Sequence, residues 1–302
     1  MKNKVLITGS SGFVGTNLFE SLHDKYDFIM PNRDNLKNSL VKEKNYDVLI
    51  HLAGIAHDTK KINNEKNYFR VNTDLTILAF NKFIESNAKV FIFLSSVKAC
   101  SDSVDGIMYE NDKPNPSTAY GRSKLKAENY IIENLKKIKD NKRVYILRPS
   151  MIHGPKNKGN LNLLLKIINM GIPWPLGLYE NKRSFCGIDN LIFVVKNLIE
   201  NNNISSGIYN VADDLAISTN ELYELICNDL NKKKNILKVP KFLIKCIAFF
   251  GDYSFLPLNT ERLKKLTESY VVSNSKIKKQ LKIDNFPDSV RDSFNKTLVT
   301  FI

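Results

Sequence analysis

A tyrosine and a lysine stand four residues apart in the segment Tyr120-x-x-x-Lys124. On a helix this spacing places both side chains on one face, with the ammonium beside the phenol. A neighbouring cation stabilises an ionised phenol and moves its pKa from about 10 toward neutrality. The pair predicts a phenol that donates a proton to a ketone oxygen as hydride reaches the carbon. Such pairs are common on helices, so the interpretation depends on the motifs that accompany this one.

Ser96 is a second candidate for chemistry, because it ends the apolar run from Val90 to Ser95. Open α/β sheets bind ligands at the carboxyl ends of their strands, which is where this hydroxyl is expected. There it would hydrogen-bond the reacting oxygen together with Tyr120. A serine that only caps the next turn is the alternative, and that role would also explain Ser95.

A glycine-rich turn forms the third motif, Gly9-x-x-Gly12-x-x-Gly15, between an apolar run and a helical pattern. Glycines let a backbone turn tightly and approach a pyrophosphate, and a helix N-terminus offers unpaired N–H groups. The motif predicts a dinucleotide site, with an ordinary strand-to-helix turn as the alternative.

The choice between NAD and NADP is expected at the end of the second strand, in the segment Met30-Pro31-Asn32-Arg33-Asp34. An acidic residue there accepts the ribose 2′-hydroxyl, and an arginine accommodates a 2′-phosphate. Arg33 favours NADP, whereas Asp34 beside it keeps NAD open. Arg33 as a simple surface turn residue is the alternative.

These motifs need elements to position them, and short apolar runs alternate with helical patterns through the first half of the chain. Strands are predicted at 5–8, 28–30, 48–53, 90–95 and 144–147, and helices at 13–23, 71–86 and 120–137. Continuous apolar strands alternating with helices predict an α/β fold with a doubly wound parallel sheet, buried on both faces.

The rhythm weakens after residue 149, where Gly and Pro recur. Residues 1–150 are therefore predicted to form the NAD(P)-binding domain, to which later segments can return. Residues 151–302 are predicted to form mainly a smaller α/β substrate region, with helices at 190–200, 219–228 and 241–250 and a strand at 207–211.

Composition excludes several classes of protein. Of the 302 residues 43% are hydrophobic and 25% charged, which is typical of globular domains rather than disordered or fibrous chains. The net charge of +14 comes from dispersed lysines without an arginine-aromatic cluster, so a solvated surface is favoured over nucleic-acid binding. A basic cleft would suit an anionic substrate such as a nucleoside diphosphate.

The cysteines and the apolar segments indicate the cellular compartment of the protein and whether it enters a membrane. The four cysteines form no C-x-x-C pair, so neither a zinc site nor a disulfide framework is indicated, and a reducing cytoplasm is predicted. The N-terminal apolar run is too short for a signal peptide. Residues 242–258 resemble a membrane segment, but Lys245 and Gly251-Asp252 interrupt them, so no membrane insertion is expected. A helix that lies on the surface of a membrane is the alternative for these residues.

Over nearly its whole length the chain resembles the extended short-chain dehydrogenase/reductases of the NAD-dependent epimerase/dehydratase family. The glycine spacing is the form found in that family. Further matching segments lie at 48–54 (VLIHLAG), 71–72 (VN), 148–155 (RPSMIHGP) and 207–212 (GIYNVA).

The resemblance implies a Rossmann-type domain, an interleaved nucleotide-sugar domain, and Ser96, Tyr120 and Lys124 as catalytic residues. It also implies a homodimer through the helices at 72–86 and 120–137, which together make a four-helix bundle. The residues expected at the cofactor are Gly9, Ser11, Gly12, Phe13, Val14, Gly15, Arg33, Leu52, Ala53, Gly54, Tyr120, Lys124, Pro149 and Ile152.

A finer resemblance is to the nucleotide-sugar 4-reductases that act on UDP-4-keto-6-deoxy-N-acetylglucosamine for surface polysaccharides. The similar segments are Ser95-Ser96-Val97-Lys98 and residues 154–160, 175–177 and 181–184. This resemblance implies that Ser96, Lys98, Asn160 and Arg183 bind the UDP-sugar, with Arg183 facing the diphosphate. Asn160 as a loop cap and Arg183 as a solvated charge are the alternatives.

Positions at which this chain differs from the family pattern reduce the number of activities to be considered. His153 stands where tyrosine is usual and is predicted to be a packed loop residue, with an acid/base role as the alternative. Cys100-Ser101 is also atypical. His51 is predicted to be a core residue or a residue at the cofactor's edge, at a strand end and without the partners of a metal ligand. Dehydratases carry Asp-Glu after their catalytic threonine, whereas Val97-Lys98 follows Ser96, so dehydration is not expected. Reduction is favoured, 4-epimerisation with retained NAD is the alternative, and a non-catalytic dinucleotide-binding protein comes third.

Overall fold

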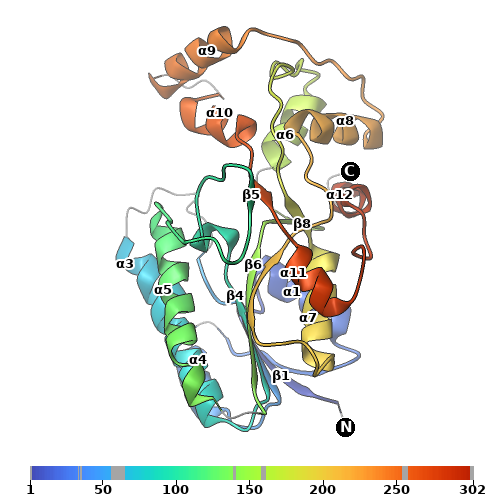
Figure 1. Ribbon diagram of the computed structural model, residues 1–302. Helices are drawn as coiled ribbons and strands as arrows, with labels where there is room; N and C mark the ends of the chain where they lie inside the picture. The colour runs from blue at the N-terminus through green and yellow to red at the C-terminus, as the bar shows by residue number, and fades with distance from the viewer. Residues whose placement is uncertain are drawn as a thin grey trace.

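A six-stranded parallel sheet in the order β2-β1-β3-β4-β6-β9 forms the centre of the computed structural model (Figure 1). The structure describes residues 2–32, 34, 36–55, 65–138, 141–157, 161–253 and 258–299. The strands are β1 (Lys4–Thr8), β2 (Asp27–Ile29), β3 (Val48–His51), β4 (Val90–Leu94), β6 (Arg143–Pro149) and β9 (Gly207–Val211). The predicted α/β class is confirmed, and the chain changes direction across the sheet between β1 and β3, where doubly wound folds bind ligands.

Helices cover both faces of this sheet, which explains the continuous apolar strands. Successive strand side chains point to opposite faces, so Val5 and Ile7 enter one core and Leu6 enters the other. The first core is closed by α1 (Phe13–Leu22), α7 (Ile188–Glu200) and α11 (Ser275–Leu281). The second core is closed by α2 (Leu36–Lys42), α4 (Leu75–Glu85) and α5 (Ala119–Glu133).

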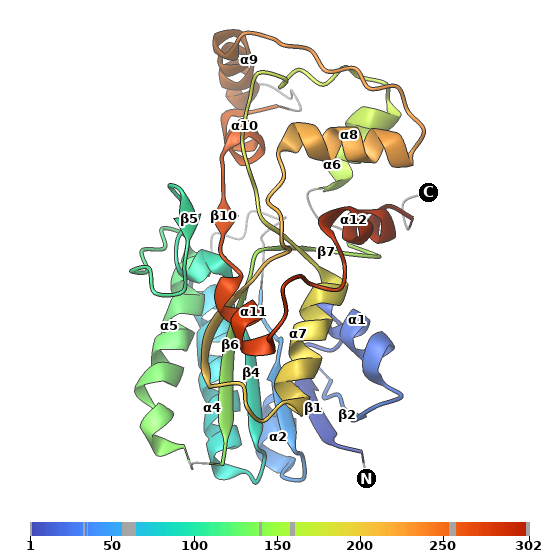
Figure 2. The ribbon, with the colours of Figure 1, turned by 45° about the vertical axis from the view of Figure 1, so that its right-hand side comes forward.

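A smaller lobe lies beyond the carboxyl ends of the strands (Figure 2). Its helices are α6 (Leu161–Asn169), α8 (Thr219–Asp229), α9 (Lys241–Tyr253), α10 (Thr260–Thr267) and α12 (Val290–Leu298). Two small parallel pairs connect it to the main sheet: β7 (Met151–His153) with β8 (Phe185–Gly187), and β5 (Ile107–Met108) with β10 (Val271–Val272). Its core gathers large side chains such as Trp174 and Phe294.

Several elements differ from the sequence-based expectation. The helix predicted at 71–86 is instead α3 (Glu65–Tyr68), a π-helical stretch (Phe69–Asp74) and then α4. The strand predicted at 207–211 is present as β9, and it pairs with β6 in the main sheet. The division at residue 150 remains a prediction, with β9 as a later segment that returns to the first part of the chain.

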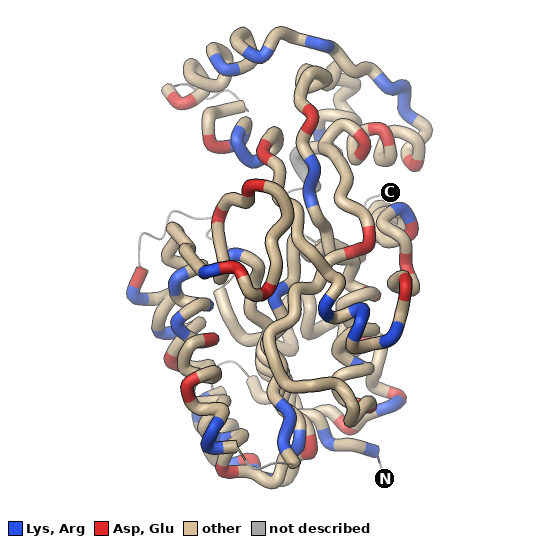
Figure 3. Tube along the Cα trace, viewed as in Figure 1, with Lys and Arg blue, Asp and Glu red and all other residues tan. Residues whose placement is uncertain are grey.

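Charged residues are distributed over both lobes, with Lys and Arg interleaved with Asp and Glu (Figure 3). Within the described part of the chain, no helix is both long enough and apolar enough to cross a membrane.

Candidate active site

The glycine turn between β1 and α1 forms a cradle for a pyrophosphate. Gly9 has φ +75°, and a Cβ there would lie 2.7 Å from the backbone nitrogen of Ala53, so the turn and the close approach of β3 both require glycine. The N-cap of α1 is Gly12, and no side chain caps the helix. Unpaired N–H groups at the N-terminus of α1 therefore suit a dinucleotide phosphate.

A groove of about 860 Å³ opens from this turn. Of the expected cofactor residues, those that line it are Gly9, Ser11, Gly12, Leu52, Ala53 and Gly54. Phe13, Val14 and Ile152 instead pack against the sheet core, Gly15 lies within α1, and Pro149 ends β6. Arg33 lies outside the described residues.

The groove also has lining residues that the sequence did not single out. Lys37 and Arg70 supply positive charge. Asp34, the acidic residue that keeps NAD as an alternative, also lines the groove. Lys37 and Arg70 occupy helical segments with no motif around them, so only the fold brings them to this groove.

His51 stabilises the wall behind the groove through a buried hydrogen-bond chain. Its Nδ1 lies 2.8 Å from Thr8 Oγ1, and its Nε2 lies 3.0 Å from Thr76 Oγ1. Burial, with a smaller effect from the charge of Lys124, lowers the pKa of His51 to about 3. A neutral imidazole in the core matches the structural role predicted for it. Across the described ranges, no three His, Cys, Asp or Glu side chains group to hold a metal ion.

Ser96 and Tyr120 come together because α5 begins against the end of β4. A Cβ on Gly121 would lie 2.4 Å from the backbone oxygen of Lys98, so glycine permits this close approach. Thr118 caps α5 by accepting from the Gly121 N–H at 3.1 Å. The Ser96 hydroxyl accepts from the Lys98 N–H at 3.2 Å and also hydrogen-bonds the Tyr120 phenol. Ser96 thus caps the turn and also contacts the tyrosine, and its catalytic role stays a prediction.

Asp102 fixes the start of α5. Its carboxylate accepts hydrogen bonds from both the backbone and the side chains of Ser117 and Thr118 at 2.7 to 3.0 Å. Burial acts to raise the pKa of Asp102, but these hydrogen bonds outweigh it and hold the pKa below its ordinary value. The ionised carboxylate is therefore the form that anchors the helix.

The protonation of Tyr120 differs from the expectation. Burial raises the pKa of its phenol above the ordinary value, and the hydrogen bond with Ser96 only partly offsets this. The Lys124 ammonium instead donates to the backbone oxygen of Leu94 at 2.8 Å and lies 4.8 Å from the centre of the Phe93 ring. The lysine occupies the same face of α5, but its contacts here are with β4, so desolvation decides the phenol's pKa.

Lys124 connects this site to the cofactor groove. Its side chain is 4% exposed, and burial lowers its pKa to about 8 against the opposing charge of Glu128. A Cβ on Gly54 would lie 3.2 Å from Lys124 Nζ, so the ammonium sits directly behind the groove wall. Tyr120 and Lys124 themselves are not groove-lining residues.

Asn72 joins the groove, the π-helical stretch and α5. Its Oδ1 accepts from the Ile55 N–H at 2.8 Å, and its Nδ2 donates to the Ile55 oxygen at 3.1 Å and to Ser123 Oγ at 3.0 Å. From the sequence, Val71-Asn72 is identified only as a segment that resembles the family. The structure gives Asn72 a positioning role beside Lys124.

Lys98 and Arg183, both predicted to bind substrate, lie in one region beside Tyr270. Lys98 Nζ is 4.5 Å from the centre of the Tyr270 ring, and Arg183 pairs with Tyr270 through the backbone. Burial lowers the pKa of Lys98, the nearby charge of Asp102 opposes this, and the charge of Arg183 lowers the pKa further. Arg183 also donates to the backbone oxygen of Lys265, so it is held in place rather than freely solvated. Asn160 lies outside the described residues.

His153 is buried on β7 rather than in a loop. Its ring stacks on Phe294 with centroids 3.9 Å apart, and its Nδ1 lies 3.0 Å from Thr297 Oγ1. Its Nε2 is 3.5 Å from Asp213. These contacts make His153 a packed residue, as predicted.

The sheet, the glycine cradle and the Ser96-Tyr120-Lys124 set define an NAD(P)-dependent enzyme of the extended short-chain dehydrogenase/reductase class. More particularly, the chain belongs to the NAD dependent epimerase/dehydratase family, whose model matches residues 5–212. This confirms the resemblance drawn from the sequence.

Curated relatives act on activated sugars. The UDP-glucose 4-epimerase of Vibrio cholerae is 31% identical over 325 residues, covering 100% of this chain and 96% of the relative. The N-acetyl-alpha-D-glucosaminyl-diphospho-ditrans,octacis-undecaprenol 4-epimerase of Escherichia coli O157:H7 is 28% identical, covering 92% and 86%. A dTDP-4-dehydro-6-deoxyglucose reductase of Escherichia coli is 26% identical, covering 77% and 83%.

Solved structures share the fold. RMD from Pseudomonas aeruginosa, complexed with NADPH, superposes with a TM-score of 0.75 at 18% identity and covers 99% of both chains. The Bordetella bronchiseptica enzyme WbmG, in complex with NAD and UDP, gives 0.76 at 14% identity, covering 100% of this chain and 94% of that one. Neighbours of this fold thus bind either cofactor.

Proposed function

We propose that the chain transfers hydride at C4 of a UDP-linked N-acetylhexosamine and acts as a 4-epimerase. The observation that carries this proposal is the contact between Ser96 and Tyr120, one helical turn from Lys124 at the back of the cofactor groove. The choice of epimerisation is supported by the two 4-epimerases that match 92% or more of the chain.

In this mechanism Tyr120 exchanges a proton with the C4 oxygen. The Ser96 hydroxyl orients the phenol and hydrogen-bonds the same sugar oxygen, which stabilises the charge that develops there. The pKa of Lys124 is about 8, and we assign to its cation the role of favouring the ionised Tyr120 that accepts the sugar proton once cofactor and sugar are bound. A nicotinamide cofactor bound at the glycine turn would supply the hydride acceptor and donor for this chemistry.

The cofactor would be held by the glycine turn and α1, with Lys124 hydrogen-bonding its ribose. Either NAD or NADP suits the groove, because Asp34 and the cations Lys37 and Arg70 all line it. We place the sugar diphosphate near Lys98 and Arg183, because burial lowers the pKa of both side chains and pairing with an anionic group would favour their charged forms. Four free cysteines support a reducing, cytoplasmic setting.

A second candidate is reduction of a UDP-4-keto-6-deoxy-N-acetylhexosamine. It uses the same three residues, and the segment Ser95-Ser96-Val97-Lys98 resembles the 4-reductases. The Escherichia coli dTDP-sugar reductase also supports it.

One assay with three substrates tests these proposals. UDP-N-acetylglucosamine is supplied with NAD, the 4-keto-6-deoxy sugar nucleotide is supplied with NADPH or NADH, and diphosphoundecaprenol-linked N-acetylglucosamine is supplied with NAD. Appearance of UDP-N-acetylgalactosamine supports the 4-epimerase. Stoichiometric oxidation of reduced cofactor by the ketone, without epimer formation, would transfer the assignment to the reductase. Turnover of the lipid-linked sugar alone would replace the UDP-sugar as substrate.

A further inference from the structure

Helix α9 buries only a narrow stripe of its surface. The buried positions are Ile244, Ala248 and Gly251, spaced four and three residues apart on one side of the helix. A Cβ on Gly251 would lie 1.9 Å from the backbone oxygen of Leu258, so the helix packs closely against the chain entering α10. The other residues of α9 are exposed.

The outward side of α9 is apolar. Its large exposed side chains are Phe242, Leu243, Ile247, Phe249, Phe250 and Tyr253, each between 43% and 81% exposed. At 3.6 residues per turn these side chains occupy one continuous arc of about 160°, opposite the buried stripe. An exposed apolar surface of this kind marks an interaction site.

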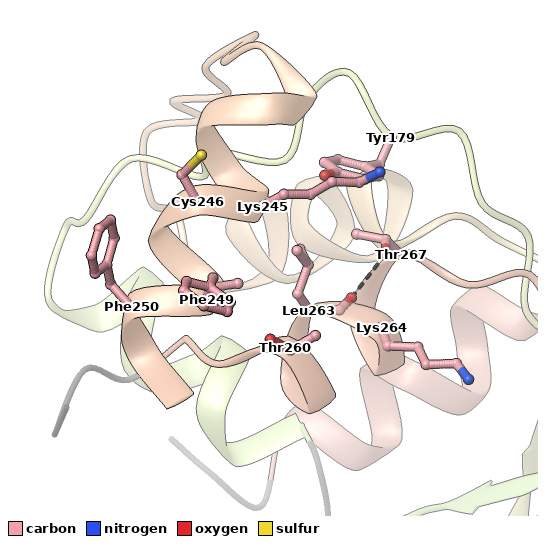
Figure 4. A pocket seen from close by; sticks show the side chains of 10 residues that line it. Tyr179, Lys245, Cys246, Phe249, Phe250, Thr260, Leu263, Lys264 and Thr267 are labelled. Atoms are coloured by element: carbon pink, nitrogen blue, oxygen red, sulfur yellow. Dashed lines mark hydrogen bonds between the residues drawn. The ribbon is translucent and has the colours of Figure 1, made fainter. Parts of the chain in front are cut away.

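A groove of about 620 Å³ lies beside this arc, between α9 and α10. Figure 4 shows Phe249 and Leu263 at the groove and Phe250 directed away from α9. Apolar surface therefore continues from the arc into a recess. Lys245 and Lys264 lie at its margin, so the recess combines hydrocarbon with positive charge.

On α9 itself, Lys241 and Lys245 flank the arc along one side, and Asp252 lies between them. The segment that enters α9 and the helix itself, residues 232–253, contain six lysines and one acidic residue, Asp252. Figure 3 shows positive charge along this segment. The net positive charge of this segment favours an anionic surface over a second copy of the same positively charged segment. Anionic lipid headgroups would pair with these lysines while the aromatic side chains enter the acyl boundary.

We propose that α9 is a docking surface for an anionic lipid bilayer, on which it lies parallel to the membrane plane. Helix α9 has 13 residues, too few to span the hydrocarbon core, so binding is interfacial. Phe242, Phe249 and Phe250 insert, and Lys241 and Lys245 remain with the headgroups. This proposal is independent of the proposed function.

The test is co-sedimentation of the full chain with vesicles of phosphatidylcholine alone or mixed with phosphatidylglycerol. We expect wild-type protein to sediment with the anionic vesicles and to be released by high salt. The double variant F249S/F250S should partition at least roughly tenfold less, because it lacks two aromatic side chains that would enter the bilayer. The control M170S/L215S removes two exposed apolar side chains elsewhere and should sediment like the wild type.

Three results would overturn the proposal. They are absence of wild-type sedimentation with anionic vesicles, equal sedimentation of F249S/F250S, and a self-association that the variant abolishes without any lipid binding. Circular dichroism checks that the variant is folded. Turnover of a water-soluble substrate should be unchanged in F249S/F250S, so loss of lipid binding and loss of the catalytic function are distinguishable.

Discussion

Tyr120 is placed between two opposing influences, burial beside Tyr68 and a hydrogen bond with Ser96. The two tyrosine rings meet edge to face at 6.3 Å, and burial raises the phenol's pKa. A protonated phenol suits proton donation to an oxygen, whereas removal of a proton from a sugar hydroxyl needs nearby positive charge. In the proposed mechanism Lys124 supplies this charge, whereas in this structure its ammonium donates to the backbone oxygen of Leu94.

The substitution Tyr120→Phe should reduce turnover by about 10²-fold or more, because the proton carrier is lost. Cofactor affinity should change little, since the phenol oxygen is not part of the groove lining. Steady-state kinetics and cofactor titration measure the two effects. Tyr130→Phe is the matched control on the same helix, where the hydroxyl donates to Asn81 at 2.9 Å away from the site. Full activity in Tyr120→Phe would refute the mechanism.

His51 makes stability depend on pH. Its pKa is about 3 in the folded chain, against about 6.5 when unfolded, so the unfolded state binds more protons between these values. Stability should therefore fall as pH is lowered from 6.5 toward 3. In His51→Gln the thermal midpoint should fall less steeply over that interval, whereas His23→Gln, which alters an exposed histidine, should follow the wild type. Identical slopes in all three proteins would contradict this account.

At the scale of elements, helix α5 connects the proton-transfer site to the sheet. Glu128 on α5 is fully buried and pairs with Arg148 on β6 at 2.6 Å. The same carboxylate accepts from the Ser95 hydroxyl, so α5 is joined to β4 as well. Because Asp102 also binds the first turn of α5, the helix is held both by the sheet and by the loop that follows Ser96.

Removal of the Asp102 carboxylate should loosen the first turn of α5. We expect Asp102→Ala to lower the free energy of unfolding by about 1–3 kcal/mol and kcat by roughly tenfold or more, since Tyr120 loses its fixed position. Asp105→Ala, in the same loop, should leave both unchanged. Chemical denaturation and initial rates give the two quantities, and a wild-type kcat in Asp102→Ala would exclude a positioning role.

The sequence allowed prediction of the elements whose physics is local. Continuous apolar runs locate β1, β3, β4 and β6, and the glycine turn locates the start of α1. The short pairs β5 with β10 and β7 with β8 join residues far apart in the chain, so no local pattern reveals them. The protonation of Tyr120 was also beyond the sequence, because the contacts of Lys124 with Leu94 and Phe93 depend on tertiary packing.

At the scale of the whole molecule, the helices α4 and α5 form the predicted dimer surface. Ile132 and Leu135 are exposed near the end of α5 and offer apolar contact for a second copy. We expect sedimentation velocity to show a dimer for the wild type and a monomer for Ile132→Glu. Leu215→Glu, at an exposed residue elsewhere, should remain dimeric. A wild-type monomer at micromolar concentration would contradict the four-helix arrangement.

The central claim is reversible hydride transfer at C4, and an isotope experiment tests it most directly. The protein, with NAD, is incubated with UDP-N-acetylglucosamine carrying deuterium at C4, and the products are analysed by NMR. We predict UDP-N-acetylgalactosamine that retains the deuterium at C4, because the hydride leaves and returns to the same carbon. Epimer without deuterium, or no epimer at all under conditions where cofactor is bound, would contradict the account.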